Sequence, residues 1–174
     1  MKVGFFCFFL FFSSLVFGQE IVWTEDRSLN WGNFKAANAA QRSQTAAYSY
    51  CGMAYHVKRS SDPNGRIEIV VKSTFDEDKS WKKTNNLGPY LLKHEQVHFD
   101  IAEVFARILR RQIKEKIKKS SDYDRIFKTL YQTVYDDYRR FQEQYDRETN
   151  HSINKEQQAF YNQLVAKLLY DLKS

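Results

Sequence analysis

The chain has 174 residues, a net charge of +6 and two cysteines. Cys7 lies in the apolar N-terminal segment, so Cys51 has no intrachain partner and a disulfide framework is excluded. We expect Cys51 to be a buried apolar residue rather than a catalytic thiol. The basic charge occurs without a recognisable nucleic-acid-binding module, so we expect no nucleic-acid partner.

Residues 1–18 are predicted to form a secretory signal peptide. Lys2 supplies its positive charge, an apolar run follows, and Gly18 stands at the −1 position of a cleavage before Gln19. The apolar run is short for a membrane span and is interrupted by serines, which favours cleavage over a membrane anchor. The sequence therefore predicts an exported protein, periplasmic or extracellular, in which residues 19–174 form a single domain.

A β-hairpin is predicted next. Residues 46–58 and 66–75 are rich in β-formers, and the connector at 59–65 is dense in turn residues. A strand edge of this kind can hold an extended peptide by backbone hydrogen bonds. His56, on the first strand, is expected to be packed or exposed rather than a metal ligand. Residues 76–88 are predicted to form a polar loop around an embedded tryptophan, Trp81.

Three long helices are predicted in the rest of the chain. Residues 89–119 lack glycine and contain proline only at the first position, where a helix tolerates it. Residues 120–122 provide a break and a new N-cap. Apolar residues at spacings of three and four predict helices over 123–150 and 153–172. These elements predict an α+β fold, with a small antiparallel sheet packed on three helices.

The first helix carries the pattern H-E-x-x-H at residues 94–98. His94 and His98 are one turn apart, so both imidazoles can bind one zinc ion from the same helix face. Glu95 points about 100° round the helix, where a carboxylate can act as a general base on water held at the metal. The pattern therefore predicts a zincin-like metal site.

A third zinc ligand is expected from the segment at 145–151. A helical hairpin returns this segment to the start of the first helix, and His151 is favoured as the ligand, with Asp146 as the substitute. The alternative for His151 is an interaction with the helix dipole. Tyr145 is a candidate donor to the oxyanion.

Other charged residues of the first helix have structural interpretations. Glu103 and Arg107 are spaced as an i,i+4 ion pair. Asp100 is expected to support the metal ligands or to cap another element. The remaining excess of positive charge is predicted to be a solvated helix face, with contact to an acidic membrane surface as the alternative. Its residues are Arg107, Arg110, Arg111, Lys114, Lys116, Lys118 and Lys119.

The chain resembles the bacterial predicted secreted Zn-dependent proteases, an H-E-x-x-H-containing domain of unknown function. The matching stretches are 29–34, 80–81, 91–107 and 145–151, followed by Gln157 or Gln158. The resemblance implies that the H-E-x-x-H residues carry a zinc-protease role and that Asp146 and His151 belong to a second signature. Ser152 departs from the pattern, because a glycine is expected after that histidine.

The sequence thus predicts a secreted or periplasmic zinc-dependent metallopeptidase that is monomeric and acts on a peptide or protein. The predicted site has His94, His98 and His151 as ligands of Zn²⁺ and Glu95 as general base. One alternative is a non-catalytic envelope protein with a structural or vestigial zinc site. Another is an amidase that acts on cell-wall peptide.

Overall fold

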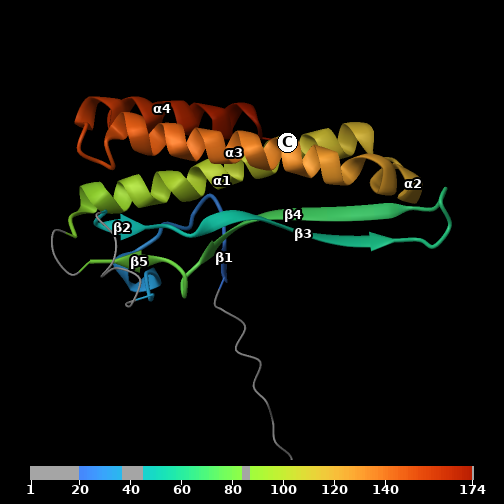
Figure 1. Cartoon of the computed structure of the whole chain (residues 1–174), viewed down its shortest axis with the longest axis horizontal. Helices are drawn as coiled ribbons and strands as arrows, with labels where there is room; N and C mark the ends of the chain where they lie inside the picture. The colour runs from blue at the N-terminus through green and yellow to red at the C-terminus, as the bar shows by residue number, and fades with distance from the viewer. Residues whose placement is uncertain (1–19, 37–44, 84–86, 174) are drawn as a thin grey trace, which may run out of the picture.

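The computed structural model describes residues 20–36, 45–83 and 87–173. The predicted signal peptide and its cleavage point lie outside these ranges. The described residues confirm an α+β class, with antiparallel strands on one side and long helices on the other (Figure 1). No helix in these ranges is long and apolar enough to cross a membrane.

The predicted hairpin is confirmed. β3 (Cys51–Arg59) pairs antiparallel with β4 (Ile67–Asp76), and Met53 stands opposite Ser73. A short strand, β1 (Glu20–Val22), pairs with the end of β4, so the sheet has the order β1-β4-β3. β1 is too short for its alternation to be recognised in the sequence. β3 therefore lies at an edge of this sheet.

A second small sheet pairs β2 (Ala47–Tyr48) with β5 (Trp81–Lys82). The prediction of a polar loop over 76–88 is wrong at its centre, because Trp81 lies in a strand and is only 7% exposed. Its ring stacks on Tyr48 with 6.1 Å between centroids. Burial of the large indole outweighs the polarity of its neighbours, and a two-residue strand shows no periodicity in the sequence.

The three predicted long helices are confirmed. The helical elements after the hairpin are α1 (Pro89–Lys116), α2 (Ser120–Asp122), the π-helical turn η3 (Tyr123–Phe127), α3 (Lys128–Thr149) and α4 (Lys155–Asp171). The new N-cap lies at Lys119, one residue before the predicted break. Asp122 is inside the helix, and its carboxylate accepts from the N–H groups of Lys118 and Lys119 at 3.0 and 3.2 Å.

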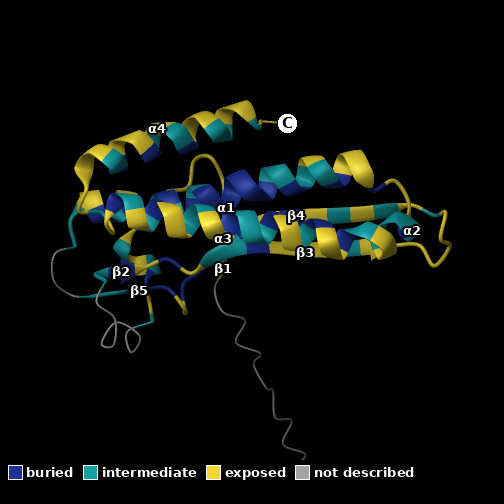
Figure 2. Ribbon diagram, turned by 45° about the horizontal axis from the view of Figure 1, so that its top comes forward, coloured by how far each residue is buried: buried dark blue, intermediate teal, exposed yellow. Residues whose placement is uncertain are grey.

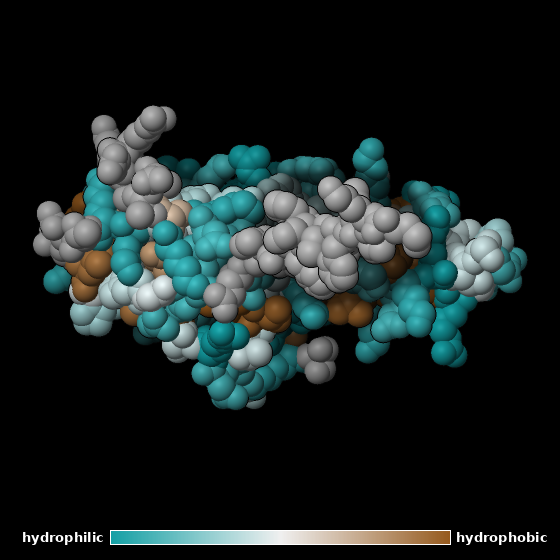
Figure 3. Space-filling view, turned by 90° about the horizontal axis from the view of Figure 1, so that it is seen from below, coloured by the Kyte–Doolittle hydropathy of each residue, from teal (hydrophilic) through white to brown (hydrophobic). Residues whose placement is uncertain are grey.

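α1 is the central element. It packs against the sheet, α3 and α4, and it contains most of the buried helical residues (Figure 2). Met53 and Val71 pack on it from the hairpin, and Val134 and Val165 are in the same core from α3 and α4. The opposite side of the hairpin points away from the helices, and its uncovered surface is mostly hydrophilic (Figure 3). Because α1 is covered on both sides, polar residues at its start are buried.

A buried carboxylate, Glu103, connects α1 to its neighbours. The predicted ion pair is confirmed, because Arg107 Nε lies 2.9 Å from Glu103. Arg110 also approaches Glu103, at 2.8 Å. Arg107 donates to the carbonyl of Leu169, and Arg110 to the carbonyl of Val71 at 3.1 Å. These two arginines therefore join α1 to α4 and β4. Arg107, whose side chain is 11% exposed, does not belong to the predicted solvated face, whereas Arg110 is 37% exposed.

Asp100 anchors the N-terminal segment to α1. Its Oδ1 accepts from Trp23 Nε1 at 2.9 Å and from Gln96 Nε2 at 2.8 Å. The other end of the Gln96 amide accepts from the N–H of Leu29 at 2.7 Å. Asp100 thus attaches the N-terminal segment to α1, which differs from both predicted roles, because its hydrogen-bond partners within the described residues are two side chains and neither a metal ligand nor a helix end.

Candidate metal centre

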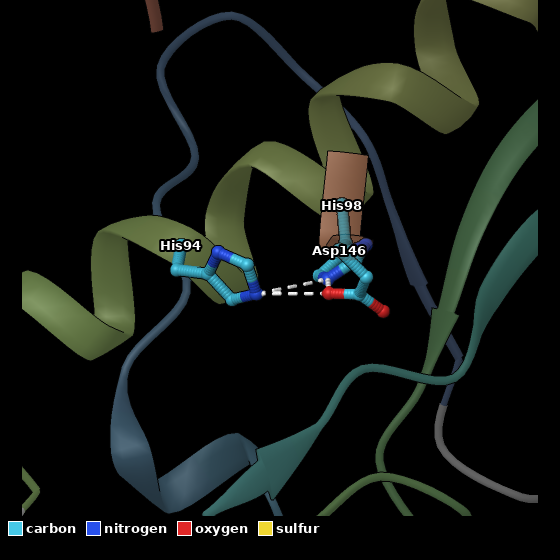
Figure 4. A group of neighbouring side chains, drawn as sticks. All are labelled: His94, His98 and Asp146. Carbon is cyan, nitrogen blue, oxygen red and sulfur yellow. Dashed lines mark hydrogen bonds and ion pairs between the residues drawn. The ribbon is translucent and has the colours of Figure 1, made fainter. Parts of the chain in front are cut away.

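Side chains from α1 and α3 meet at one point near the start of α1. His94 and His98 lie one turn apart on α1, and Asp146 faces them from α3 (Figure 4). The two Nε2 atoms are 3.2 Å apart, and each is 3.1 Å from Asp146 Oδ1. Among the described residues, these three form a group that can hold a metal ion. We call it the metal triangle.

The size of the metal triangle suits a small divalent cation. Zinc binds imidazole and carboxylate at about 2.0–2.1 Å, so donor atoms of a tetrahedral site lie about 3.3–3.4 Å apart. The observed separations of 3.1, 3.1 and 3.2 Å are only slightly shorter. Three protein ligands also leave a fourth position for water or substrate, which is the arrangement of catalytic zinc sites.

A buried glutamine on α4 orients the ring of His94. Gln158 Nε2 donates to the Tyr145 hydroxyl at 2.6 Å, and that hydroxyl donates to the His94 carbonyl at 3.2 Å. This sequence of donors makes Gln158 Oε1 the acceptor that lies 2.8 Å from His94 Nδ1. Nδ1 of His94 therefore carries a proton, and Nε2 is the ring atom that faces the metal triangle.

A glutamine on α3 does the same for His98. Gln142 Nε2 donates to the His98 carbonyl at 2.9 Å, which leaves Gln142 Oε1 as the acceptor 2.5 Å from His98 Nδ1. Metal-binding histidines usually donate their second ring N–H to an acceptor of this kind, which fixes the ring and raises its basicity. Both rings are therefore oriented before a cation arrives.

We expect Gln142→Leu to weaken zinc binding about 10–100-fold, because it removes the acceptor for His98 Nδ1 while keeping most of the volume. Titration against a chelating zinc indicator measures the effect. Gln132→Leu is the matched control, because Gln132 is exposed on the same helix and its amide bonds Asp136. Equal affinities of the two variants would contradict the role assigned to Gln142.

His98 and Asp146 form a charged pair when no cation is bound. Burial alone lowers the pKa of His98, but the hydrogen bond and negative charge of Asp146 outweigh it and raise the pKa to about 9. Burial alone raises the pKa of Asp146, but the two histidines outweigh it and hold that pKa well below its usual range. At neutral pH, Asp146 is therefore ionised and His98 carries a proton where the cation would bind.

Zinc binding is consequently expected to release about one proton at neutral pH. The proton on His98 must leave before its Nε2 can coordinate, so the apparent affinity rises up to about tenfold per pH unit below pH 9 and levels off above it. Calorimetric titration in buffers with different ionisation enthalpies gives the number of protons released. An affinity that stays constant between about pH 6 and 9 would rule out this linkage.

Glu95 lies beside the metal triangle and is not a member of it. It is only 2% exposed. Its Oε2 accepts from Ser49 Oγ at 2.7 Å, and Ser49 lies on the segment between β2 and β3. Its negative charge is among those that raise the pKa of His98. The carboxylate is thus held near the metal position by a residue that the sequence analysis did not identify.

The metal triangle and Glu95 line a cleft of about 610 Å³, a size typical of ligand-binding sites. Residues 45–54, which include β2 and the start of β3, form one wall of the cleft, and residues of α3 also line it. The side chains of His94 and His98 are 3% and 12% exposed, whereas Asp146 is 34% exposed. The metal position therefore opens to the cleft on the Asp146 side.

His151 lies at the rim of the cleft, outside the metal triangle. Its side chain is 53% exposed, and its Nδ1 is 3.4 Å from Asp146 Oδ1. Whether it becomes a ligand stays a prediction. Asn150, His151 and Ser152 have left-handed φ values of 47°, 49° and 75°. Such values cost a residue with a Cβ about 1–2 kcal/mol, which explains why glycine suits the position of Ser152.

The remaining predicted residues have other surroundings. Tyr145 is fully buried, with its hydroxyl engaged by Gln158 and the His94 carbonyl, so it supports His94 and does not face substrate. Cys51 is half-buried in the cleft wall, and burial raises its pKa to about 12, which disfavours a thiolate. His56 is exposed on β3 opposite Val70, as expected.

The fold and the site define an α+β protein with a His–His–Asp group able to hold a metal ion. The chain belongs to the family described as bacterial protein of unknown function (DUF922), whose model matches residues 63–152. That range includes the metal triangle and Glu95. No curated protein and no solved structure matches the chain. The family description assigns no activity, so the protease role implied by the resemblance is a proposal.

Proposed function

We propose that the chain is a zinc-dependent metallopeptidase, exported as its N-terminal sequence predicts. The observation that carries this proposal is the convergence of two imidazole Nε2 atoms and one carboxylate oxygen, within 3.1–3.2 Å of one another, in a cleft that also contains Glu95. The opening on the Asp146 side favours a catalytic site over a structural one, because substrate can reach the metal position.

The chain's own residues would divide the chemistry as follows. When bound, zinc supplies a Lewis acid that polarises the scissile carbonyl and acidifies water. Glu95 takes a proton from the attacking water, whose oxygen bonds to the carbonyl carbon. The carbon–nitrogen bond then breaks, and Glu95 passes the proton to the leaving amine. Because Ser49 Oγ donates a hydrogen bond to Oε2 of Glu95, we assign this proton transfer to the other carboxylate oxygen, Oε1.

The backbone beside the site supports a peptide substrate. The N–H of Lys83 donates to the carbonyl of Ala46 at 2.8 Å, so the peptide groups of residue 46 face β5. Neighbouring residues of a strand direct their peptide groups to opposite sides. Ala47, which is in β2 and lines the cleft, thus directs its peptide groups away from β5. An extended peptide can pair with this edge next to Glu95.

The test compares zinc-loaded wild type, chelator-treated wild type and Glu95→Gln on a panel of peptides, an unfolded protein and a cell-wall peptide, with products identified by mass spectrometry. We expect cleavage only by the loaded wild type, with a loss of about 10²–10⁴-fold in Glu95→Gln and an unchanged zinc content. Glu115→Gln is the control, since Glu115 is exposed on the same helix. Failure to bind zinc or to cleave any member of the panel would refute the proposal. Cleavage of the cell-wall peptide alone would favour the amidase.

A further inference from the structure

The face of α3 that carries Asp146 continues as a row of tyrosines. Gln142, Tyr138, Tyr135 and Tyr131 precede Asp146 at spacings of three or four residues, which places them all on one helix face. All of them line the cleft. The ring centroids of Tyr131 and Tyr135 are 6.0 Å apart, and those of Tyr135 and Tyr138 are 5.9 Å apart. The cleft wall that starts at the metal triangle is therefore aromatic further along.

Two of the three tyrosine hydroxyls bond the neighbouring strand. Tyr138 donates to the carbonyl of Cys51 at 2.7 Å, and Tyr131 donates to the carbonyl of Met53 at 3.1 Å. Both carbonyls lie on the edge of β3, so these hydroxyls stand where the backbone of an added strand would pair. A ligand in this part of the cleft is consequently held through its side chains, in contrast to one beside residues 47–49.

Tyr135 is the member of the row that is available to a ligand. Its ring is half-buried between the other two, and its hydroxyl has no hydrogen-bond partner within residues 20–36, 45–83 and 87–173. The rings on either side are held by their bonds to β3. The site thus combines a fixed aromatic surface with one polar tip, which suits stacking or edge-to-face contact with another ring.

We infer that Tyr135 and Tyr131 form a selectivity subsite for an aromatic side chain of an extended polypeptide. This inference rests on the proposed peptidase function, which places cleavage of the peptide bond at the metal triangle. Tyr135 lies eleven positions before Asp146 on α3, a rise of about 16 Å. An extended peptide spans about 3.3 Å per residue. The selected side chain therefore lies about five residues from the bond at the metal triangle, and short peptides do not reach the subsite.

The experiment measures binding and cleavage separately. Zinc-loaded Glu95→Gln is titrated with fluorescein-labelled dodecapeptides that differ only in the position of a single phenylalanine. We expect one phenylalanine position to bind about tenfold more tightly than the others. Tyr135→Ala in the same background removes this preference, and Tyr135→Leu serves if the alanine variant fails to fold. Tyr170→Ala is the control, since Tyr170 is 74% exposed on α4 and should leave the preference intact.

The outcomes separate this inference from the proposed function. Equal binding of all phenylalanine positions, or a preference that persists in Tyr135→Ala and Tyr135→Leu, overturns the subsite even if the wild type cleaves peptides. A preference that depends on Tyr135, together with no cleavage by wild type, keeps the subsite and refutes the peptidase. Cleavage by wild type that is fastest for the same phenylalanine position supports both.

Discussion

Asp146→Ala is expected to lower the affinity for zinc about a thousandfold, whereas His151→Ala changes it less than about tenfold. The reason is geometric. Asp146 Oδ1 is 3.1 Å from both imidazole Nε2 atoms, whereas His151 is half-exposed and contacts the group only through Asp146 at 3.4 Å. Competition titration with a chelator of known zinc affinity measures both effects, and circular dichroism checks that the variants are folded.

His56→Ala is the control for removing an imidazole, because His56 is exposed on the hairpin, away from the cleft. A larger loss of affinity in His151→Ala than in Asp146→Ala would mean that His151 turns into the coordination sphere when zinc binds. That result would restore the ligand set predicted from the sequence. Equal large losses would indicate four protein ligands and a closed site, which would argue against catalysis.

The sequence could not decide whether Asp146 or His151 is the third metal ligand. Imidazole is a common zinc ligand, which favours His151 when only residue types and spacing are known. The structure shows that Asp146 lies within α3, on the same face as Gln142 and Tyr138, which puts it opposite α1. His151 lies beyond the end of α3, in a left-handed turn whose direction helix periodicity does not specify.

The residues that orient the ligands were also beyond sequence reasoning. Gln142 and Gln158 contact histidines that are 44 and 64 residues away along the chain. A glutamine has no motif of its own, and Gln158 entered only through the resemblance, without a role. One signal was present, because Gln142 is four residues from Asp146 and so shares its helix face. Ser49 gave no signal, since its contact with Glu95 depends on the path of the chain between β2 and β3.

The fold was easier to predict where an apolar pattern repeats over many residues. The three helices and the hairpin each repeat their apolar pattern several times, and their positions follow from that repetition. β1, β2 and β5 have two or three residues each, so they form only because tertiary partners are available. The same dependence on partners applies to Arg107 and Arg110. The helical pattern places them on the solvent side, but both form ion pairs with the buried Glu103.

Glu103→Gln is expected to lower the free energy of unfolding by about 3 kcal/mol. The side chain of Glu103 is 6% exposed and that of Arg107 is 11% exposed, so removing the carboxylate charge leaves a buried guanidinium without its counter-charge. The effect should lie at the low end of the range for buried pairs, because Arg110 is 37% exposed and water partly screens it. Urea denaturation followed by circular dichroism measures the change.

Glu115→Gln gives the comparison on the same helix. Glu115 and Arg111 are 3.9 Å apart and are 61% and 65% exposed, so this pair is expected to contribute at most about 1 kcal/mol. If Glu103→Gln lowered the free energy of unfolding no more than Glu115→Gln does, the hydrogen bonds from Arg107 and Arg110 to the carbonyls of Leu169 and Val71 would have to be sufficient to stabilise the two arginines. Glu103 lies near the middle of α1, five residues beyond His98, and its carboxylate bonds Arg107 and Arg110 rather than a residue of the metal triangle. Zinc affinity should therefore change little in Glu103→Gln while the protein remains folded. A parallel loss of stability and zinc affinity at low denaturant would instead mean that the Glu103 cluster sets the position of α1 against α3 at the site.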